Sequence, residues 1–302
     1  MGALTDAGFL GLGNMGAPMA LRLIHPDARL HVYDPDPKAV ARLVEAGAVA
    51  HDSPRSVADA AAVVMACLPS QAVCENAVFG QDGVALGNSV RVYVEMSTIG
   101  PTAAASIARR LGLQRIGMVD APVSGGPAAA LAGTLTVMLA GAAAAVAQAM
   151  PGLERIAKTV HKLGELPGQA QAMKLVNNVL LAANMAAASE ALAIGVKAGL
   201  DADVMARVIK SSTGQSAALD ILARYAFTDA FDFGAHMSIL AKDVELAMTE
   251  AGNLEVPASV LAQAQGLWRA AMQEGRGQDD FTSIIKSVEQ RAKVRVRGAP
   301  RQ

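Results

Sequence analysis

A glycine-rich turn between a short apolar run and a helix-forming stretch limits the folds that this chain can adopt. Residues 8–11 predict a strand, and the turn that follows reads Gly11-Leu12-Gly13-Asn14-Met15-Gly16. In such a turn the first two glycines permit a tight bend and close approach of a pyrophosphate, and the third lets the helix pack against the strand. The free N–H groups at the N-terminus of the helix also favour the binding of phosphate groups. We predict that all six residues contact a dinucleotide; a glycine turn without a ligand is the alternative.

An acidic residue follows the second predicted strand, 30–33. Asp34 lies 18 residues after Gly16, where a carboxylate accepts hydrogen bonds from the adenosine ribose hydroxyls. A carboxylate there repels the 2′-phosphate of NADP, and the next residues, 35–37, include no arginine. The sequence therefore favours NAD over NADP.

The order of the remaining elements predicts two domains. Short apolar runs alternate with helical stretches over the first 160 or so residues, which is typical of βαβ units on a parallel sheet. Further strands are predicted at 62–68, 91–95, 116–120 and 135–140. We predict an α/β, Rossmann-like, doubly wound nucleotide-binding domain over residues 1–163.

The pattern changes after Pro167-Gly168. Residues 169–198 are strong helix formers without proline, and no strand alternation reappears after them. Helix breaks are predicted near Gly199, Gly214, 231–234, Pro257 and 275–277. We therefore predict a long interdomain helix and an all-α domain over 164–302.

Composition excludes several classes of protein. With 52% apolar and 18% charged residues, a chain of 302 residues can bury two domain cores. The net charge of −1 argues against binding nucleic acid or an anionic membrane through bulk electrostatics. The two cysteines, Cys67 and Cys74, provide neither a disulfide framework nor metal-ligand spacing, and the histidines are scattered. We expect no bound metal.

No targeting segment is visible in the sequence. Residues 1–8 lack the basic and apolar regions of a signal peptide. The most apolar stretches, around 121–150 and 179–199, are interrupted by glycine, proline or polar residues, so neither supplies about 20 uninterrupted apolar residues. The basic run 291–297 is predicted to be a solvated, frayed tail. We expect a cytoplasmic protein with no membrane or nucleic-acid partner.

Four short motifs follow one another along the chain. They are 8–20, Gly-Phe-Leu-Gly-Leu-Gly-Asn-Met-Gly-Ala-Pro-Met-Ala; 120–126, Asp-Ala-Pro-Val-Ser-Gly-Gly, with Gly-Thr-Leu at 133–135; 174–178, Lys-Leu-Val-Asn-Asn; and 240–243, Leu-Ala-Lys-Asp. In this order they resemble the β-hydroxyacid dehydrogenases, a family that includes 3-hydroxyisobutyrate dehydrogenase, tartronate semialdehyde reductase and L-threonate dehydrogenase. The resemblance implies a Rossmann-like domain, an interdomain helix and a helical domain, assembled into homodimers or homotetramers.

The resemblance also implies roles for individual residues. Lys174 corresponds to the catalytic lysine, and Ser124, Gly125 and Gly126 to the loop that holds the acid end of the substrate. The residues implied to line the cofactor site are Leu68, Pro69, Thr98 and, closing over the nicotinamide, Lys242. The sequence departs from the family before Lys174, where Glu165 and Ala170 replace two of three usual glycines and Gly168 keeps the third.

The chemistry of alcohol oxidation explains why a lysine is needed. The nicotinamide takes a hydride, so the protein must supply a base for the hydroxyl proton. An ordinary lysine titrates near 10.4, so Lys174 is expected to have its pKa lowered by desolvation and by the nicotinamide charge. Asn178 lies four residues further along the predicted helix, on the same face, where it can orient the ammonium and the substrate. A solvated helix lysine is the alternative.

The sequence therefore predicts NAD-dependent oxidation of a short β-hydroxy acid, similar to 3-hydroxyisobutyrate, to a semialdehyde or keto acid. One alternative is an NADPH-dependent reductase of a short semialdehyde acid. Another is a dinucleotide-binding scaffold without turnover, since a fold does not guarantee chemistry. The 6-phosphogluconate dehydrogenases have a much larger helical domain, and imine reductases typically carry another residue in place of Lys174.

Overall fold

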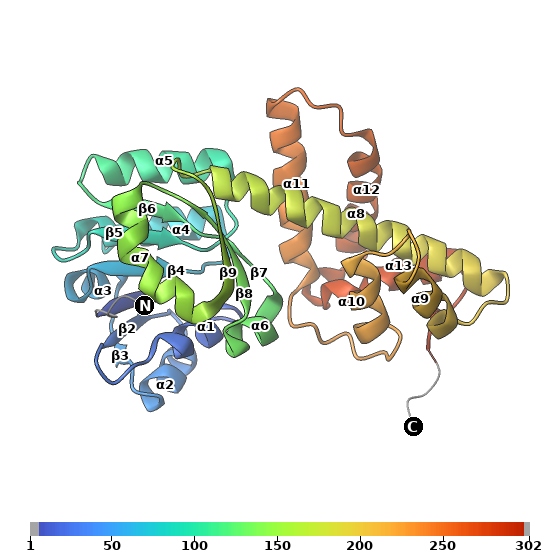
Figure 1. Ribbon diagram of the computed structural model, residues 1–302, viewed down its shortest axis with the longest axis horizontal. Coiled ribbons are helices and arrows are strands. Elements are labelled where there is room, and N and C mark those ends of the chain that lie inside the picture. Colours follow the sequence, from blue (N-terminus) through green and yellow to red (C-terminus); the bar gives the residue numbers. More distant parts are fainter. Residues whose placement is uncertain (1–5, 299–302) are drawn as a thin grey trace. The chain divides into compact units, whose positions relative to one another are not determined.

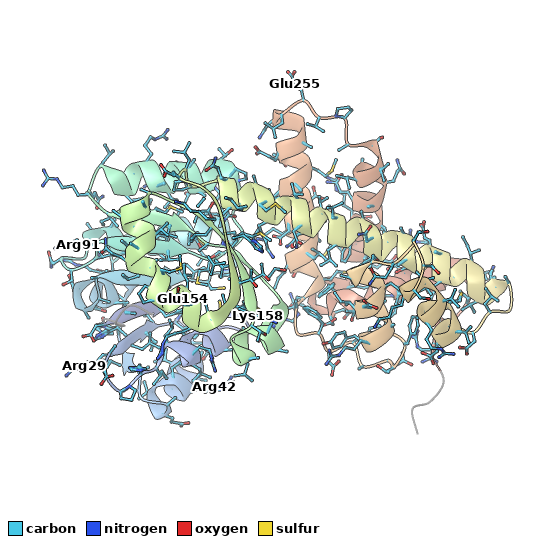
Figure 2. All side chains as sticks on the ribbon, viewed as in Figure 1. Arg29, Arg42, Arg91, Glu154, Lys158 and Glu255 are labelled. Atoms are coloured by element: carbon cyan, nitrogen blue, oxygen red, sulfur yellow. The ribbon has the colours of Figure 1, made fainter. Side chains whose placement is uncertain are left out.

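The computed structural model describes residues 6–298 and divides into two compact units, Met1–Lys174 and Leu175–Gln302, called here the α/β unit and the helical unit (Figure 1). Most of the N-terminal segment 1–8 examined for a signal peptide lies outside the described residues. Charged side chains such as Arg29, Arg42 and Arg91 project outward from the α/β unit (Figure 2).

The α/β unit is built on a nine-stranded sheet, in the order β3-β2-β1-β4-β5-β6-β8-β7 with β9 beside β8. The strands are β1 (Ala7–Leu10), β2 (Leu30–Tyr33), β3 (Val49–Ala50), β4 (Val63–Ala66), β5 (Val92–Glu95), β6 (Gly117–Asp120), β7 (Val123–Ser124), β8 (Leu135–Ala140) and β9 (Ala157–Gly164). The first six strands in sequence are parallel. Their order is that of a doubly wound nucleotide-binding domain, which confirms the predicted fold.

Helices cover both faces of the sheet. They are α1 (Gly16–Leu23), α2 (Pro37–Glu45), α3 (Pro54–Ala60), α4 (Gln71–Phe79), α5 (Pro101–Gly112), α6 (Gly126–Ala132) and α7 (Ala143–Ile156). Successive strand side chains point to opposite faces. In β4, Val63 and Met65 join the core that includes α1, α2 and α7, whereas Val64 and Ala66 join the core that includes α3, α4 and α5.

All six predicted strands are present, but β3, β7 and β9 were not predicted. Two of these have only two residues each, too short for an alternation signal. The third, β9, lies at an edge, and most of its residues are exposed. An exposed edge strand needs no apolar face, so its sequence lacks the alternation that predicts a strand. The sheet is also not wholly parallel, because β8 runs antiparallel to β6 and β7.

The helical unit contains only helices among its described residues, as predicted. They are α8 (Gln169–Lys197), which begins in the α/β unit, α9 (Ala202–Lys210), α10 (Ala217–Tyr225), α11 (Met237–Asn253), α12 (Ser259–Gln273) and α13 (Ile284–Ala292), with short 3-10 turns at Arg276–Gln278 and Phe281–Ser283. Each of the five predicted breaks falls between two of these helices. The core is centred on the fully buried Trp268, whose indole N–H donates to the Ala182 carbonyl at 3.1 Å.

Among the helices of residues 6–298, α8 alone has the length and apolar composition that crossing a membrane requires. Its most apolar 18-residue window has a mean hydropathy of 1.7, and 44% of that window is buried inside the protein. The helix continues through Asn184 and Glu190 without a break. Buried residues of α8 such as Met185 and Leu192 belong to the apolar core of the helical unit, so core packing accounts for part of this hydropathy.

The prediction of a frayed basic tail was wrong. Val296 is fully buried, and its N–H donates to the Glu289 carboxylate at 2.7 Å. Arg297 pairs with Glu289 at 2.5 Å and with Asp229 at 2.7 Å. Because the Glu289 carboxylate is largely removed from water, it needs these partners, which hold the segment after α13 against the helical unit.

Candidate active site

The glycine turn lies between β1 and α1, beside the point where the strand order reverses. Gly11 has a φ of +86°, and a Cβ there would collide with the Cys67 carbonyl oxygen. A Cβ on Gly16 would collide with the carbonyl oxygen of Gly11. Around Gly13, in contrast, no atom of a residue other than the glycine and its two chain neighbours lies within 4 Å of the added Cβ. Packing within the protein therefore explains the first and third glycines, and the open space over Gly13 fits a bound pyrophosphate.

Asp34 stands beside this turn, at the end of β2. Its carboxylate accepts hydrogen bonds from the N–H of Leu12 at 2.6 Å and from the N–H of Asp36 at 2.8 Å. The side chain is only partly buried, and each carboxylate oxygen can accept a further bond. The arrangement suits recognition of ribose hydroxyls, and the residues present fit a dinucleotide.

The loop after β5 is held by a buried carboxyl group that the sequence analysis missed. Glu95 accepts from the Ser97 N–H and from the Tyr93 hydroxyl, both at 2.9 Å. The Ser97 hydroxyl in turn accepts from the Leu68 N–H at 2.7 Å. Complete burial raises the pKa of Glu95 to about 7, against the opposing effect of these hydrogen bonds. The predicted cofactor residues Leu68 and Thr98 therefore lie on two loops joined through Ser97.

The predicted substrate loop follows β6. Ser124 ends β7 and is half-buried, and Gly125 and Gly126 have φ values of +137° and +76°. A Cβ on Gly125 would also lie 2.8 Å from the Ala129 side chain. These positions require glycine for backbone reasons, and they leave N–H groups unobstructed by side chains.

Lys174 lies in the second turn of α8, and its ammonium donates to the Val123 carbonyl at 2.8 Å. Since Val123 precedes Ser124, the ammonium lies beside the predicted substrate loop. The α/β unit thus brings together Lys174 and Ser124, which are 50 residues apart in the sequence.

Asp120, inside the second family motif, holds the start of α8. Its buried carboxylate accepts from the N–H of Gly168 at 2.8 Å and the N–H of Gln171 at 3.1 Å. Burial raises the pKa of Asp120, and the hydrogen bonds from Gln171 and Gly168 oppose this. Gly168 has a φ of +106°, and a Cβ there would lie 2.9 Å from the Pro101 carbonyl oxygen. The glycine that this chain retains before Lys174 is therefore the one that its own backbone requires.

Two predicted site residues belong to the helical unit, and both bind Asp243. The Asn178 amide donates to the Asp243 carboxylate at 2.6 Å, and the Lys242 ammonium lies 3.0 Å from it. Asp243 is only 2% exposed. The Asn178 carbonyl oxygen accepts from Asn177 at 3.0 Å. The amide that was predicted to orient Lys174 is thus engaged within the helical unit, and Asp243 is a second buried acid that the sequence analysis did not single out.

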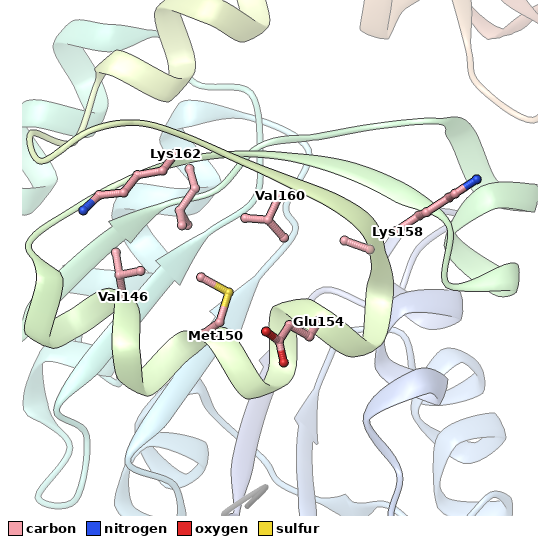
Figure 3. Close-up of a pocket in the computed structure, with 8 residues that line it drawn as sticks. Val146, Met150, Glu154, Lys158, Val160 and Lys162 are labelled. Carbon is pink, nitrogen blue, oxygen red and sulfur yellow. The ribbon is translucent and has the colours of Figure 1, made fainter. Parts of the chain in front are cut away.

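A separate hollow lies elsewhere in the α/β unit. It has a volume of about 610 Å³, lies between α7 and β9 and is lined by residues such as Val146, Met150 and Val160 (Figure 3). None of the predicted site residues lines it. Among residues 6–298 there is also no group of three His, Cys, Asp or Glu side chains that could hold a metal ion.

Comparisons with known proteins bear on the family and the fold. Residues 6–164 match the family model of the NAD binding domain of 6-phosphogluconate dehydrogenase, and residues 168–288 match that described as NAD-binding of NADP-dependent 3-hydroxyisobutyrate dehydrogenase. The chain is 34% identical to 2-(hydroxymethyl)glutarate dehydrogenase of Eubacterium barkeri, over 96% of this chain and 97% of that enzyme. It is 36% identical to 3-hydroxyisobutyrate dehydrogenase of Pseudomonas aeruginosa, over 94% and 98%.

The fold is also shared with a solved structure, Mycobacterium tuberculosis 3-hydroxyisobutyrate dehydrogenase with L-serine. The TM-score is 0.86 at 29% identity, covering 95% of this chain and 99% of that one. The motifs, the strand order and these full-length matches lead to one assignment. The chain belongs to the β-hydroxyacid dehydrogenase family of NAD(P)-dependent oxidoreductases.

Proposed function

We propose that this protein oxidises a short β-hydroxy acid with NAD and that Lys174 accepts the hydroxyl proton. The observation that carries the proposal is the contact between the Lys174 ammonium and the Val123 carbonyl, which holds the ammonium beside Ser124. A base and a carboxylate-binding loop so near each other suit a substrate in which hydroxyl and carboxylate are separated by very few bonds.

Each residue has a defined part in this reaction. The nicotinamide, when bound, accepts the hydride from the carbinol carbon. Lys174 in its neutral form takes the hydroxyl proton, and as ammonium it returns a proton to the alkoxide in the reverse direction. Ser124 and the N–H groups that follow it bind the carboxylate and orient the carbinol toward Lys174. The rate of oxidation should therefore fall at low pH, where Lys174 is protonated.

The names of several relatives, though not that of L-threonate dehydrogenase, suggest a narrower substrate class. The compounds 3-hydroxyisobutyrate and 2-(hydroxymethyl)glutarate, and the L-serine in the solved structure, share the unit HOCH2–CH(R)–COO⁻. We infer that the substrate of this chain carries the same unit. The carboxylate and primary alcohol are then common to all candidates, and the group R distinguishes them.

Asp34 supports NAD as the cofactor. Its carboxylate lies beside the glycine turn, where it would meet the adenosine ribose, and Asp36 adds a second negative charge two residues later. Both repel a 2′-phosphate. The family model for residues 168–288 names NADP, but that match lies outside the segment that we propose contacts the ribose. An NADPH-dependent reductase of a semialdehyde acid is thus the second candidate.

The test is NADH or NADPH formation at 340 nm over a panel of 2-substituted 3-hydroxypropanoates. We expect turnover with NAD, and an Asp34→Ala variant should narrow the preference for NAD over NADP. Faster turnover with NADP than with NAD would contradict the cofactor assignment. Tight NAD binding without turnover of any member of the panel would favour the alternative of a dinucleotide-binding scaffold that catalyses no reaction.

A further inference from the structure

A buried glutamine lies one turn before Lys174. Gln171 is 0% exposed, and its side chain makes four hydrogen bonds. Its carbonyl oxygen accepts from the N–H of Ile99 at 2.9 Å and of Gly100 at 3.2 Å. Its amide nitrogen donates to the Ser97 carbonyl at 3.0 Å and to the Asp120 carboxylate at 2.8 Å. Both lone pairs and both N–H groups of the amide are therefore in use.

These four bonds join the segments on which the proposed reaction depends. The loop 97–100 contains Thr98, which is expected to line the cofactor site. Asp120 begins the segment that leads to Ser124, and Gln171 itself precedes Lys174 by three residues on α8. One side chain thus connects the cofactor loop, the substrate loop and the helix that carries the proposed base.

The amide cannot be replaced by a side chain of similar size without loss. An apolar residue would leave two buried N–H groups, one carbonyl and one carboxylate oxygen without this partner, and buried polar groups without partners are unfavourable. A carboxylate would keep the two acceptor bonds, to Ile99 and Gly100, but would lose both donors. It would also place a negative charge against Asp120.

We propose that Gln171 is a positioning residue for the reaction: it fixes the separation between the loop of Thr98 and the ammonium of Lys174. This inference rests on the proposed function of Lys174. A displacement of about 1 Å between a base and the reacting atoms can lower a rate by roughly 10²-fold. Gln171 therefore acts on catalysis through the placement of other groups and has no contact with substrate in this account.

The test compares Gln171→Ala and Gln171→Glu with the control Gln169→Ala, which removes an exposed glutamine from the first turn of the same helix. We measure the Kd of ADP-ribose, the Kd of NAD, kcat and the primary deuterium isotope effect on kcat. ADP-ribose reports the glycine turn and Asp34, so its Kd should stay within about 2-fold in all variants, because Gln171 contacts neither.

For Gln171→Ala we expect kcat to fall by ~10- to 100-fold, the Kd of NAD to rise more than that of ADP-ribose, and the isotope effect to increase. For Gln171→Glu, kcat and the Kd of NAD should lie between the values of Gln171→Ala and those of the wild type. Its activity relative to wild type should recover at lower pH, where the protonated carboxyl regains one donor. Gln169→Ala should behave as wild type.

The number of ADP-ribose-binding sites measures how much of each variant is folded. If kcat and NAD affinity per such site equal the wild-type values in both Gln171 variants, the proposal is overturned. Any loss of total activity would then reflect only a smaller folded fraction. If the wild type turns over no hydroxy acid, the proposed function fails by itself. The Kd of NAD relative to ADP-ribose in Gln171→Ala then still decides whether Gln171 organises the cofactor loop.

Discussion

In the α/β unit the buried carboxyl groups of Glu95 and Asp120 bind backbone N–H groups of loops and helix starts. In the helical unit, acids such as Glu245 and Glu274 pair with arginines at the surface. Its buried acids among the described residues are Asp243, which binds the side chains of Asn178 and Lys242, and Glu289, which pairs with Arg297 and accepts from the Val296 N–H. The two units therefore differ in the groups that their acidic side chains bind.

The difference shows where precision is needed. A buried, fully hydrogen-bonded network holds its members in one arrangement, because any displacement leaves a polar group without a partner. Exposed ion pairs contribute little, since water competes for both partners. The α/β unit thus supplies rigidity at the carboxyl ends of its strands, where the predicted cofactor and substrate loops lie, while apolar packing around Trp268 holds the helical unit together.

The largest effect should come from Lys174, the last residue of the α/β unit. Lys174→Met should lower kcat by ~10³-fold, because a general base is lost. Binding of NAD and the melting temperature should change little. The control is Lys197→Met, an exposed lysine in the last turn of the same helix. If Lys174→Met keeps more than about a tenth of the activity, another group is the base.

Glu95 and Glu245 should respond to pH in opposite directions. The pKa of Glu95 is raised by burial to about 7, so the folded state holds its proton more tightly. Its contribution to stability is present below pH ~4.5 and is lost as pH rises to about 7, up to roughly 3 kcal/mol in the free energy of unfolding. Glu95→Gln should remove most of this loss, measured by circular dichroism in urea at pH 5 and pH 8.

The pKa of Glu245 is lowered by its hydrogen bonds with Arg269. The stabilisation by Glu245 is present above its ordinary pKa and is lost as pH falls. Glu245→Gln should therefore lower the free energy of unfolding only at higher pH. Equal pH dependence in the Glu95→Gln variant and the wild type would show that the buried carboxyl does not titrate between pH 5 and 8.

Two glycines in one turn should separate binding from folding. Gly13→Ala adds a methyl group to open space, so stability should hold while the Kd of NAD rises by ~10-fold through contact with the pyrophosphate. Gly11→Ala places a side chain at a φ of +86° and against the Cys67 carbonyl, so it should destabilise the α/β unit. Unchanged NAD affinity in Gly13→Ala would mean that the cofactor does not approach this glycine.

The smallest effect should come from the surface of the helical unit. Arg269 pairs with Glu245 at 2.6 Å, but both side chains are largely exposed. Arg269→Ala should shift the melting temperature by less than about 2 °C. The fluorescence of Trp268, the single tryptophan of the chain, reports on this unit alone. A larger shift would show that the surface pairs of the helical unit are as important as the buried network of the α/β unit.

Local patterns predicted much of the fold. Six of the nine strands of the sheet, the all-helical second unit and its five breaks follow from residues that are neighbours in the sequence, because apolar periodicity and turn residues act over a few positions. The strand β9 carried no such signal, since it is an exposed edge. The segment after α13 was misjudged because its basic residues bind Glu289 and Asp229, which are brought to it only by folding.

Residue types at short, defined spacings were sufficient to predict the dinucleotide turn, the candidate base and the family. Tertiary structure alone decided which polar groups support them: Gln171 reaches Ser97 across 74 residues, and Asn178 reaches Asp243 across 65. A buried hydrogen bond needs its two partners to meet in space, and no local pattern encodes that meeting. The motifs thus point to the proposed reacting groups, and the fold determines how these residues are held.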